Sequence, residues 1–90
     1  MTDRSSRREV RNPILGLPAA VEALRSLDRE QRAALRIVLL AVREQMREKE
    51  VISYRKRKGP MVEYYMSGAT YAKHIANVLG MLNRGERRDG

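Results

Sequence analysis

The chain has 90 residues, which is enough for one small domain with a limited hydrophobic core. It carries 19 Lys and Arg residues against 11 Asp and Glu residues, and the resulting net charge of +8 favours acidic partners: nucleic acid, an anionic membrane or an acidic protein surface. Cysteine is absent, which excludes disulfides, thiolate metal sites and a cysteine nucleophile.

The N-terminal part is expected to lead into a short helix. Residues 1–11 are almost entirely polar or charged, and we expect them to form a disordered basic arm. An extended segment is expected to begin at Asn12-Pro13, because the residue before a proline avoids the α conformation. Pro18 suits the first position of a helix over residues 18–27. The apolar edge of this helix consists of Leu17, Val21, Leu24 and Leu27.

The second predicted helix covers residues 29–58 and begins at a capping box. Asp28 is the expected N-cap, and Gln31 follows three residues later. Gly59-Pro60 is expected to end the helix, because glycine is a common C-terminal stop and the residue before proline resists the α conformation. The apolar arc of the helix consists of Leu35, Val38, Leu39, Val42 and Met46.

Residues 51–65 allow a second interpretation. Val51 to Tyr54 and Met61 to Tyr65 could form two short strands around the Lys58-Gly59-Pro60 turn. We favour helices, because polar and apolar residues do not alternate over a sustained stretch and no other strands are predicted that would complete a sheet.

The third predicted helix covers residues 60–83, with Pro60 at its first position. Apolar and small residues recur along it at alternating spacings of four and three, as in a coiled-coil seam. The members of this seam are Met61, Tyr65, Gly68, Ala72, Ile75, Leu79 and Leu82. The seam is longer than the apolar arc of the second helix, so part of it needs another cover, and we take it as the interface of a homodimer.

The predicted fold is therefore all-α. A short N-terminal helix precedes a long antiparallel helical hairpin, which dimerisation would complete. The single domain is expected to cover residues 12–83, and residues 84–90 are expected to form a disordered tail.

Five arginines of the second predicted helix fall on one line. Their separations of three, four, seven and four residues place them within an arc of about 60° on an α-helix. They are Arg29, Arg32, Arg36, Arg43 and Arg47, and we call them the arginine stripe. A row of like charges repels itself, and a polyanion lying along the row would reverse the sign of that energy.

The alternative is a solvated face paired with neighbouring acids. Arg47 has Glu44 and Glu50 three residues away on either side, which suits such pairing. Most of the stripe lacks that support, because three of its members have no acidic residue three or four positions away. These are Arg29, Arg36 and Arg43.

A second basic cluster follows the stripe. Tyr54 continues the line of the stripe and precedes four consecutive cations: Arg55, Lys56, Arg57 and Lys58. Cations beside an aromatic ring suit phosphate contacts combined with base stacking. The predicted nucleic-acid contacts are therefore the stripe together with these five residues.

Signals of catalysis are missing from the chain. His74 is the only histidine and is expected on a polar surface, with no carboxylate three or four residues away to share a metal. No glycine-rich phosphate loop is present, and no paired carboxylates fall in an apolar setting. We therefore expect no catalytic residue, no metal site and no cofactor.

Two segments carry a resemblance to a known group of proteins. NPILGLPAA, from Asn12 to Ala20, and YRKRKGPMVEYY, from Tyr54 to Tyr65, are similar to short uncharacterised proteins encoded in proteobacterial phages and prophages. The resemblance implies a phage setting and a location in the cytoplasm of a bacterial host cell, and it implies no functional residue. In agreement, the basic N-terminus has no apolar stretch of the kind that a secretory signal requires.

The sequence as a whole predicts a small non-enzymatic protein that binds nucleic acid, DNA or RNA, mainly by electrostatic contacts to the backbone. The alternative is a protein-binding inhibitor or adaptor of a host machine, such as a polymerase, nuclease or CRISPR complex, whose acidic surface would take the stripe. Membrane binding is disfavoured. The longest strongly apolar run, Ile37 to Val42, is far shorter than the about 20 residues of a bilayer span, and the second helix lacks Trp and Phe.

Overall fold

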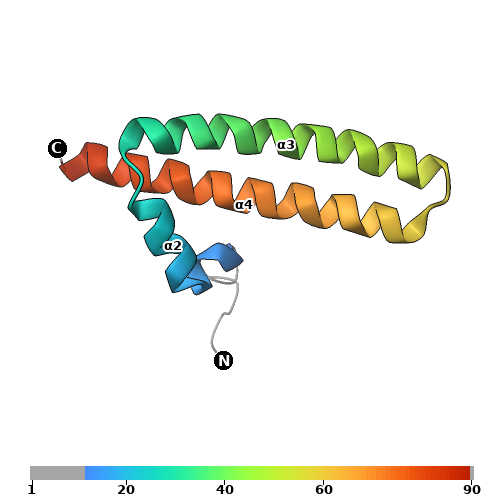
Figure 1. Cartoon of the computed structure of the whole chain (residues 1–90), viewed down its shortest axis with the longest axis horizontal. Coiled ribbons are helices and arrows are strands. Elements are labelled where there is room, and N and C mark those ends of the chain that lie inside the picture. The colour runs from blue at the N-terminus through green and yellow to red at the C-terminus, as the bar shows by residue number, and fades with distance from the viewer. Residues whose placement is uncertain (1–11, 90) are drawn as a thin grey trace, which may run out of the picture.

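The computed structural model describes residues 12–89, and it places the side chains of residues 12–85. These residues contain a short 3-10 helix, η2 (Pro13–Gly16), and three α-helices: α2 (Pro18–Arg25), α3 (Arg29–Arg55) and α4 (Gly59–Asp89). Helices α3 and α4 form a long antiparallel hairpin, and α2 lies beside it (Figure 1). The predicted all-α class, with a short first helix and a long hairpin, is confirmed. Residues 51–65 contain no strand.

The start of α3 is fixed by the predicted capping box. Asp28 Oδ1 accepts a hydrogen bond from the Gln31 backbone N–H at 2.8 Å, and Gln31 Oε1 accepts one from the Asp28 N–H at 2.9 Å. The two bonds satisfy N–H groups that have no partner inside the helix. Glu30 adds negative charge to the first turn, where the helix dipole favours it.

The end of α3 differs from the prediction. The helix ends at Arg55, three residues before Lys58, and Gly59 is the first residue of α4 rather than the stop of α3. The Lys58 N–H donates to the Ser53 carbonyl at 2.9 Å and the Arg57 N–H donates to the Tyr54 carbonyl at 3.0 Å, which is the Schellman pattern. Arg57 closes this motif with a φ of 58°, in the left-handed region that glycine usually occupies.

Helix α4 is longer than predicted. It continues to Asp89, six residues beyond Asn83, so residues 84–89 are helical and do not form the predicted disordered tail. Residues 1–11, the predicted arm, and Gly90 lie outside the described residues. No helix in the described part of the chain combines the length and apolar character needed to cross a membrane.

The contact between α3 and α4 combines small residues with long ones. The α4 side buries Ala69, Ala72, Ala76 and Leu79. A Cβ atom added to Gly68 would lie 3.3 Å from the Met46 sulfur, so the Met46 side chain of α3 lies directly on this glycine. Because most α4 residues in this contact have small side chains or none, the long side chains of α3 can extend across the surface of α4.

The helices are rotated about their axes relative to the prediction. The residues of α3 that turn toward α4 recur every seven positions: Arg32, Leu39, Met46 and Ser53. Val38 and Val42, which belong to the predicted apolar arc, are exposed, and Val38 retains 55 % of its accessible surface. The packing line of α3 therefore lies closer to the arginine stripe than the sequence predicted.

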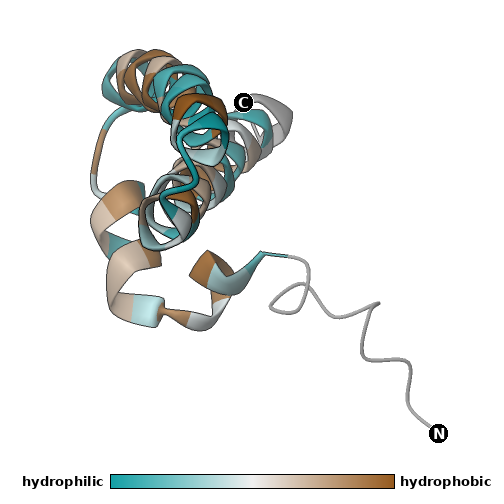
Figure 2. Cartoon of the chain, turned by 90° about the vertical axis from the view of Figure 1, so that its right-hand side faces the viewer, coloured by the Kyte–Doolittle hydropathy of each residue, from teal (hydrophilic) through white to brown (hydrophobic). Residues whose placement is uncertain are grey.

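The N-terminal elements cover a different side of α4. Val78 lies about 180° around α4 from Ala69, yet it is fully buried, because η2 and α2 pack there. Asn12 Nδ2 donates to the His74 carbonyl at 2.9 Å, and Ile14 is buried beside it. The segment after Asn12 is thus a 3-10 helix rather than extended chain. Figure 2, which looks along the hairpin, shows these elements on the side of α4 away from α3.

Candidate nucleic-acid interface

The structure removes one residue from the arginine stripe. Arg32 retains only 1 % of its accessible surface and lies on the packing line of α3, seven residues before Leu39. A partner cannot reach it without opening the hairpin. The structure therefore does not present Arg32 for the predicted contact with nucleic acid.

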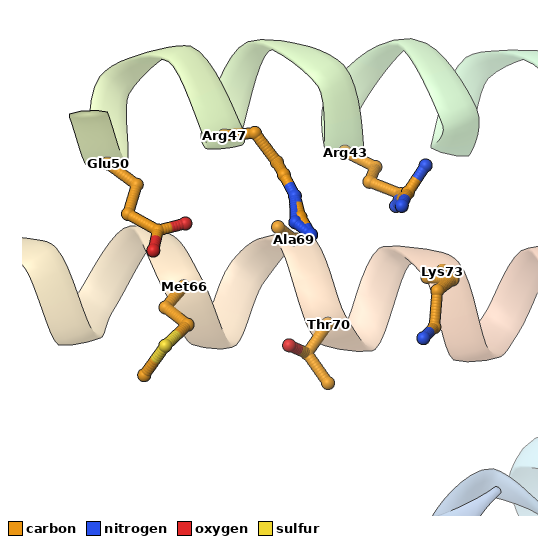
Figure 3. A pocket seen from close by; sticks show the side chains of 7 residues that line it. All are labelled: Arg43, Arg47, Glu50, Met66, Ala69, Thr70 and Lys73. Atoms are coloured by element: carbon orange, nitrogen blue, oxygen red, sulfur yellow. The ribbon is translucent and has the colours of Figure 1, made fainter. Parts of the chain in front are cut away.

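Two further stripe residues lie in a groove between the long helices. Arg43 is half-buried and Arg47 is exposed, and both side chains reach from α3 toward α4 (Figure 3). They line a groove of about 310 Å³, whose wall on α4 includes Thr70 and Lys73. Glu50 is the only acidic residue that lines it. The groove thus combines three cations from two helices with one carboxylate.

Two more cations, Arg36 and Arg84, lie beside Gly80, further along the same edge of the helical hairpin. The position that a Cβ would take on Gly80 lies 3.2 Å from Arg36 Nε and 3.3 Å from Arg84 Nη1. Because glycine has no side chain, the side chains of Arg36 and Arg84 can both lie over α4 at this position. Arg29 lines the same part of the edge, and its carbonyl accepts a hydrogen bond from Asn83 Nδ2 at 3.1 Å.

We call this edge of the hairpin the cationic flank. It consists of Arg29, Arg36, Arg43, Arg47, Lys73 and Arg84. The sequence prediction missed Lys73, which it placed on a polar outer face, and Arg84, which it placed in the tail. A usable signal was present, because residues 73, 77, 80 and 84 share one face of a helix that continues past Asn83.

The charges of the cationic flank are not neutralised within the described part of the molecule. None of its six residues forms an ion pair with a carboxylate whose side chain the structure places, and the predicted alternative pairing of Arg47 with Glu44 or Glu50 is not formed. The ion pair found among the described residues lies outside the flank, on α2, where Arg25 Nε and Glu22 Oε1 are 3.9 Å apart. The flank therefore presents uncompensated positive charge to the solvent.

The second predicted cluster forms the tip of the hairpin. Tyr54 retains 74 % of its accessible surface, and the four cations that follow it are all exposed. They are Arg55, Lys56, Arg57 and Lys58. Tyr54 is seven residues beyond Arg47, two helical turns along the same line, so the tip extends the cationic flank.

His74 lies beside η2 and is half-buried, not on an open surface as predicted. Its Nδ1 is buried and has no hydrogen-bond partner in the described part of the chain. Burial lowers the pKa of this imidazole below 6.5, and the nearby Lys73 ammonium lowers it further. Among the described residues, no three histidine or acidic side chains lie close enough together to hold a metal ion.

The predicted oligomer interface is divided by the fold. Ala72 and Leu79 are buried within the hairpin, so these two members of the seam are already covered. The other members, Met61, Tyr65, Gly68, Ile75 and Leu82, are exposed or half-buried. Burial of part of the seam follows from the rotation of the helices.

Two of the uncovered seam residues, Met61 and Gly68, belong to a surface that we call the apolar flank. Val38, Val42 and Met46 follow one another at four-residue spacing on α3, and Met46 lies on Gly68 of α4. A groove of about 530 Å³ extends from there over Tyr64 and Tyr71. The apolar flank consists of Val38, Val42, Met46, Met61, Tyr64, Gly68 and Tyr71. Such a contiguous exposed patch is typical of an interaction surface.

Comparison of the chain with protein-family models, with curated proteins and with solved structures finds no match. The function of the two flanks is therefore inferred from their chemistry.

Proposed function

We propose that this protein is a small, non-enzymatic nucleic-acid-binding protein whose cationic flank contacts the phosphate backbone. The observation that supports this most directly is the row of unneutralised cations contributed by both long helices. From Arg36 to Tyr54 the row is about 27 Å long at 1.5 Å per residue, which is long enough to meet several consecutive phosphates.

The expected binding mode is electrostatic. The cations lie along the edge of a helical pair and not on a single exposed helix of the kind that enters the major groove. Phosphate contacts of this kind position a nucleic acid without reading its sequence. We therefore expect weak sequence preference and a strong dependence on salt. The resemblance of two segments to phage-encoded proteins suggests a bacterial cytoplasm as the setting.

A mobility-shift titration of two double variants tests the proposal. R47Q/K73Q removes two charges from the cationic flank, and R25Q/K49Q removes two exposed charges elsewhere. On duplex DNA each phosphate contact contributes about −0.9 to the slope of log affinity against log salt, so R47Q/K73Q should flatten this slope by about 1.8.

The matched control R25Q/K49Q should change the slope by less than half as much. Equal losses in the two variants would mean that net charge matters and the flank does not. Absence of binding by the unaltered protein to duplex and single-stranded oligonucleotides at low salt would overturn the proposed function.

The apolar flank favours a second candidate function, a protein-binding inhibitor or adaptor of a host polymerase, nuclease or CRISPR complex. Exposed side chains such as Val38 and Tyr71 suit the core of a protein interface better than a nucleic-acid contact. Affinity capture from a nuclease-treated bacterial lysate separates the candidates. Recovery of one stoichiometric protein supports the second, and loss of all bound material supports nucleic acid.

A further inference from the structure

The turn at the tip of the hairpin contains an arginine where glycine would be less strained. Arg57 has a φ of 58°, which disfavours any side chain with a Cβ. The motif that it closes ends helices most often with glycine. The Arg57 side chain is exposed and forms no hydrogen bond or ion pair with the described residues. Folding therefore gives no reason for an arginine at this position.

The groove beside Arg57 is lined by two kinds of side chain. It has a volume of about 510 Å³, and its lining includes the cations Arg57 and Lys58 together with Tyr54 and Val62. A planar apolar group that carries a negative charge would match this lining.

We propose that this groove binds one unpaired nucleotide of a nucleic-acid strand, and this proposal rests on the proposed function. The base stacks on the exposed ring of Tyr54, and its phosphate lies between Arg57 and Lys58. Tyr54 continues the line of the cationic flank, so a strand that follows the flank reaches the groove at its end. A duplex keeps its bases stacked inside and cannot place one on Tyr54. The ligand class is therefore single-stranded nucleic acid.

A fluorescence experiment tests the stacking directly. The chain has no tryptophan, so Tyr54→Trp introduces a single indole reporter at the groove. Oligothymidylate should quench it over the same concentration range that produces the mobility shift, and a hairpin duplex should not. Tyr64→Trp is the control, because Tyr64 retains 63 % of its surface but lies on the apolar flank. Equal quenching at both positions, or by both ligands, would overturn the proposal.

Substitutions at the groove test its energetic contribution. Stacking of one base contributes about 1–3 kcal/mol on alanine substitution, so Tyr54→Ala should weaken oligothymidylate binding by roughly 5- to 150-fold. Tyr54→Phe keeps the ring and should stay within about twofold of the unaltered protein. For Tyr54→Ala, the loss of affinity for oligothymidylate should exceed any loss of affinity for the hairpin duplex, because only an unpaired base can stack on the ring.

Arg57 provides a test with two opposite signs. Arg57→Gly removes the strain of a side chain at a positive φ, so it should raise the midpoint of thermal unfolding. The same variant should weaken oligothymidylate binding, because it removes a cation from the groove. Arg57→Lys keeps the positive charge and should retain that binding. A purely structural residue would change stability and binding in the same direction. Undiminished binding by Tyr54→Ala and Arg57→Gly, with a loss in R47Q/K73Q, would overturn the groove and leave the proposed function standing.

Discussion

Two arginines of the same stripe have opposite environments. Arg32 is buried on the packing line of α3, whereas Arg36, four residues later, is exposed and crosses Gly80. They differ by about 40° around the helix, and this rotation separates a core position from a surface position. Position on the stripe therefore does not determine function by itself.

Alanine substitutions should separate the roles of these two residues. Arg32→Ala removes a large buried side chain and should lower the free energy of unfolding by about 2–4 kcal/mol, as large-to-small core changes do. Arg36→Ala should change it by less than about 1 kcal/mol and should weaken nucleic-acid binding. Urea unfolding of both variants checks this. A similar small effect for both would contradict the buried position of Arg32.

His74 should make stability depend on pH in a defined direction. Burial and the nearby Lys73 lower the pKa of the folded imidazole below 6.5, so between the two pKa values the unfolded chain binds more protons than the folded chain. The free energy of unfolding should therefore fall as the pH drops through 6.5 toward the folded pKa, and it should not change on this account above pH 7.

Comparison of urea unfolding at pH 7.5 and pH 5.5 measures this effect. The decrease should be larger in the unaltered protein than in His74→Gln, which cannot titrate at this position. An equal decrease in both would show that other groups cause the pH dependence.

At the scale of elements, the sequence correctly predicted the features that depend on residues close to one another in the chain. Asp28 and Gln31 form the expected capping box, and the spacing of apolar residues correctly indicated two long helices in a hairpin. The turn was harder, because Gly59 is the conspicuous breaker in the sequence, whereas the left-handed residue is Arg57. The composition of residues 84–89 suggested a tail, although Arg and Glu are good helix formers.

The rotation of each helix could not be read from one helix alone. Whether Gly68 or Ala69 faces α3 depends on the side chains that α3 presents, and Met46 fits over the glycine from one edge. For the same reason, the stripe could be predicted on α3, but its combination with Lys73 and Arg84 required the two helices side by side. Residues from separate elements form a site only when the packing is known.

The whole molecule is an elongated hairpin with two unlike flanks. Its principal extents are 50, 40 and 20 Å, and two helices in contact can each bury only one line of residues. The cationic flank and the apolar flank lie on opposite edges of that contact. Apolar side chains that the hairpin leaves open are stabilised when another apolar surface covers them.

We expect a second copy of the chain to cover the apolar flank, for electrostatic and geometric reasons. In a two-fold dimer the same patch faces itself, and two hairpins packed in this way form a four-helix arrangement. The cationic flanks then point in opposite directions, which minimises repulsion between two chains of net charge +8. We therefore expect the protein to self-associate through Val38, Val42 and their neighbours.

Two adjacent residues of α3 provide the test. Val38 and Ile37 are both more than half exposed, at 55 % and 69 %, but Val38 lies on the apolar flank and Ile37 lies beside Arg29 and Arg36. Val38→Glu places a charge in the expected interface and should shift sedimentation toward the monomer, whereas Ile37→Glu should leave the dimer intact. A monomer at all concentrations of the unaltered protein, or dissociation by both variants, would contradict this interface. Because a dimer carries two cationic flanks, Val38→Glu should also weaken binding to long nucleic acids, although every cation of the flank remains in place.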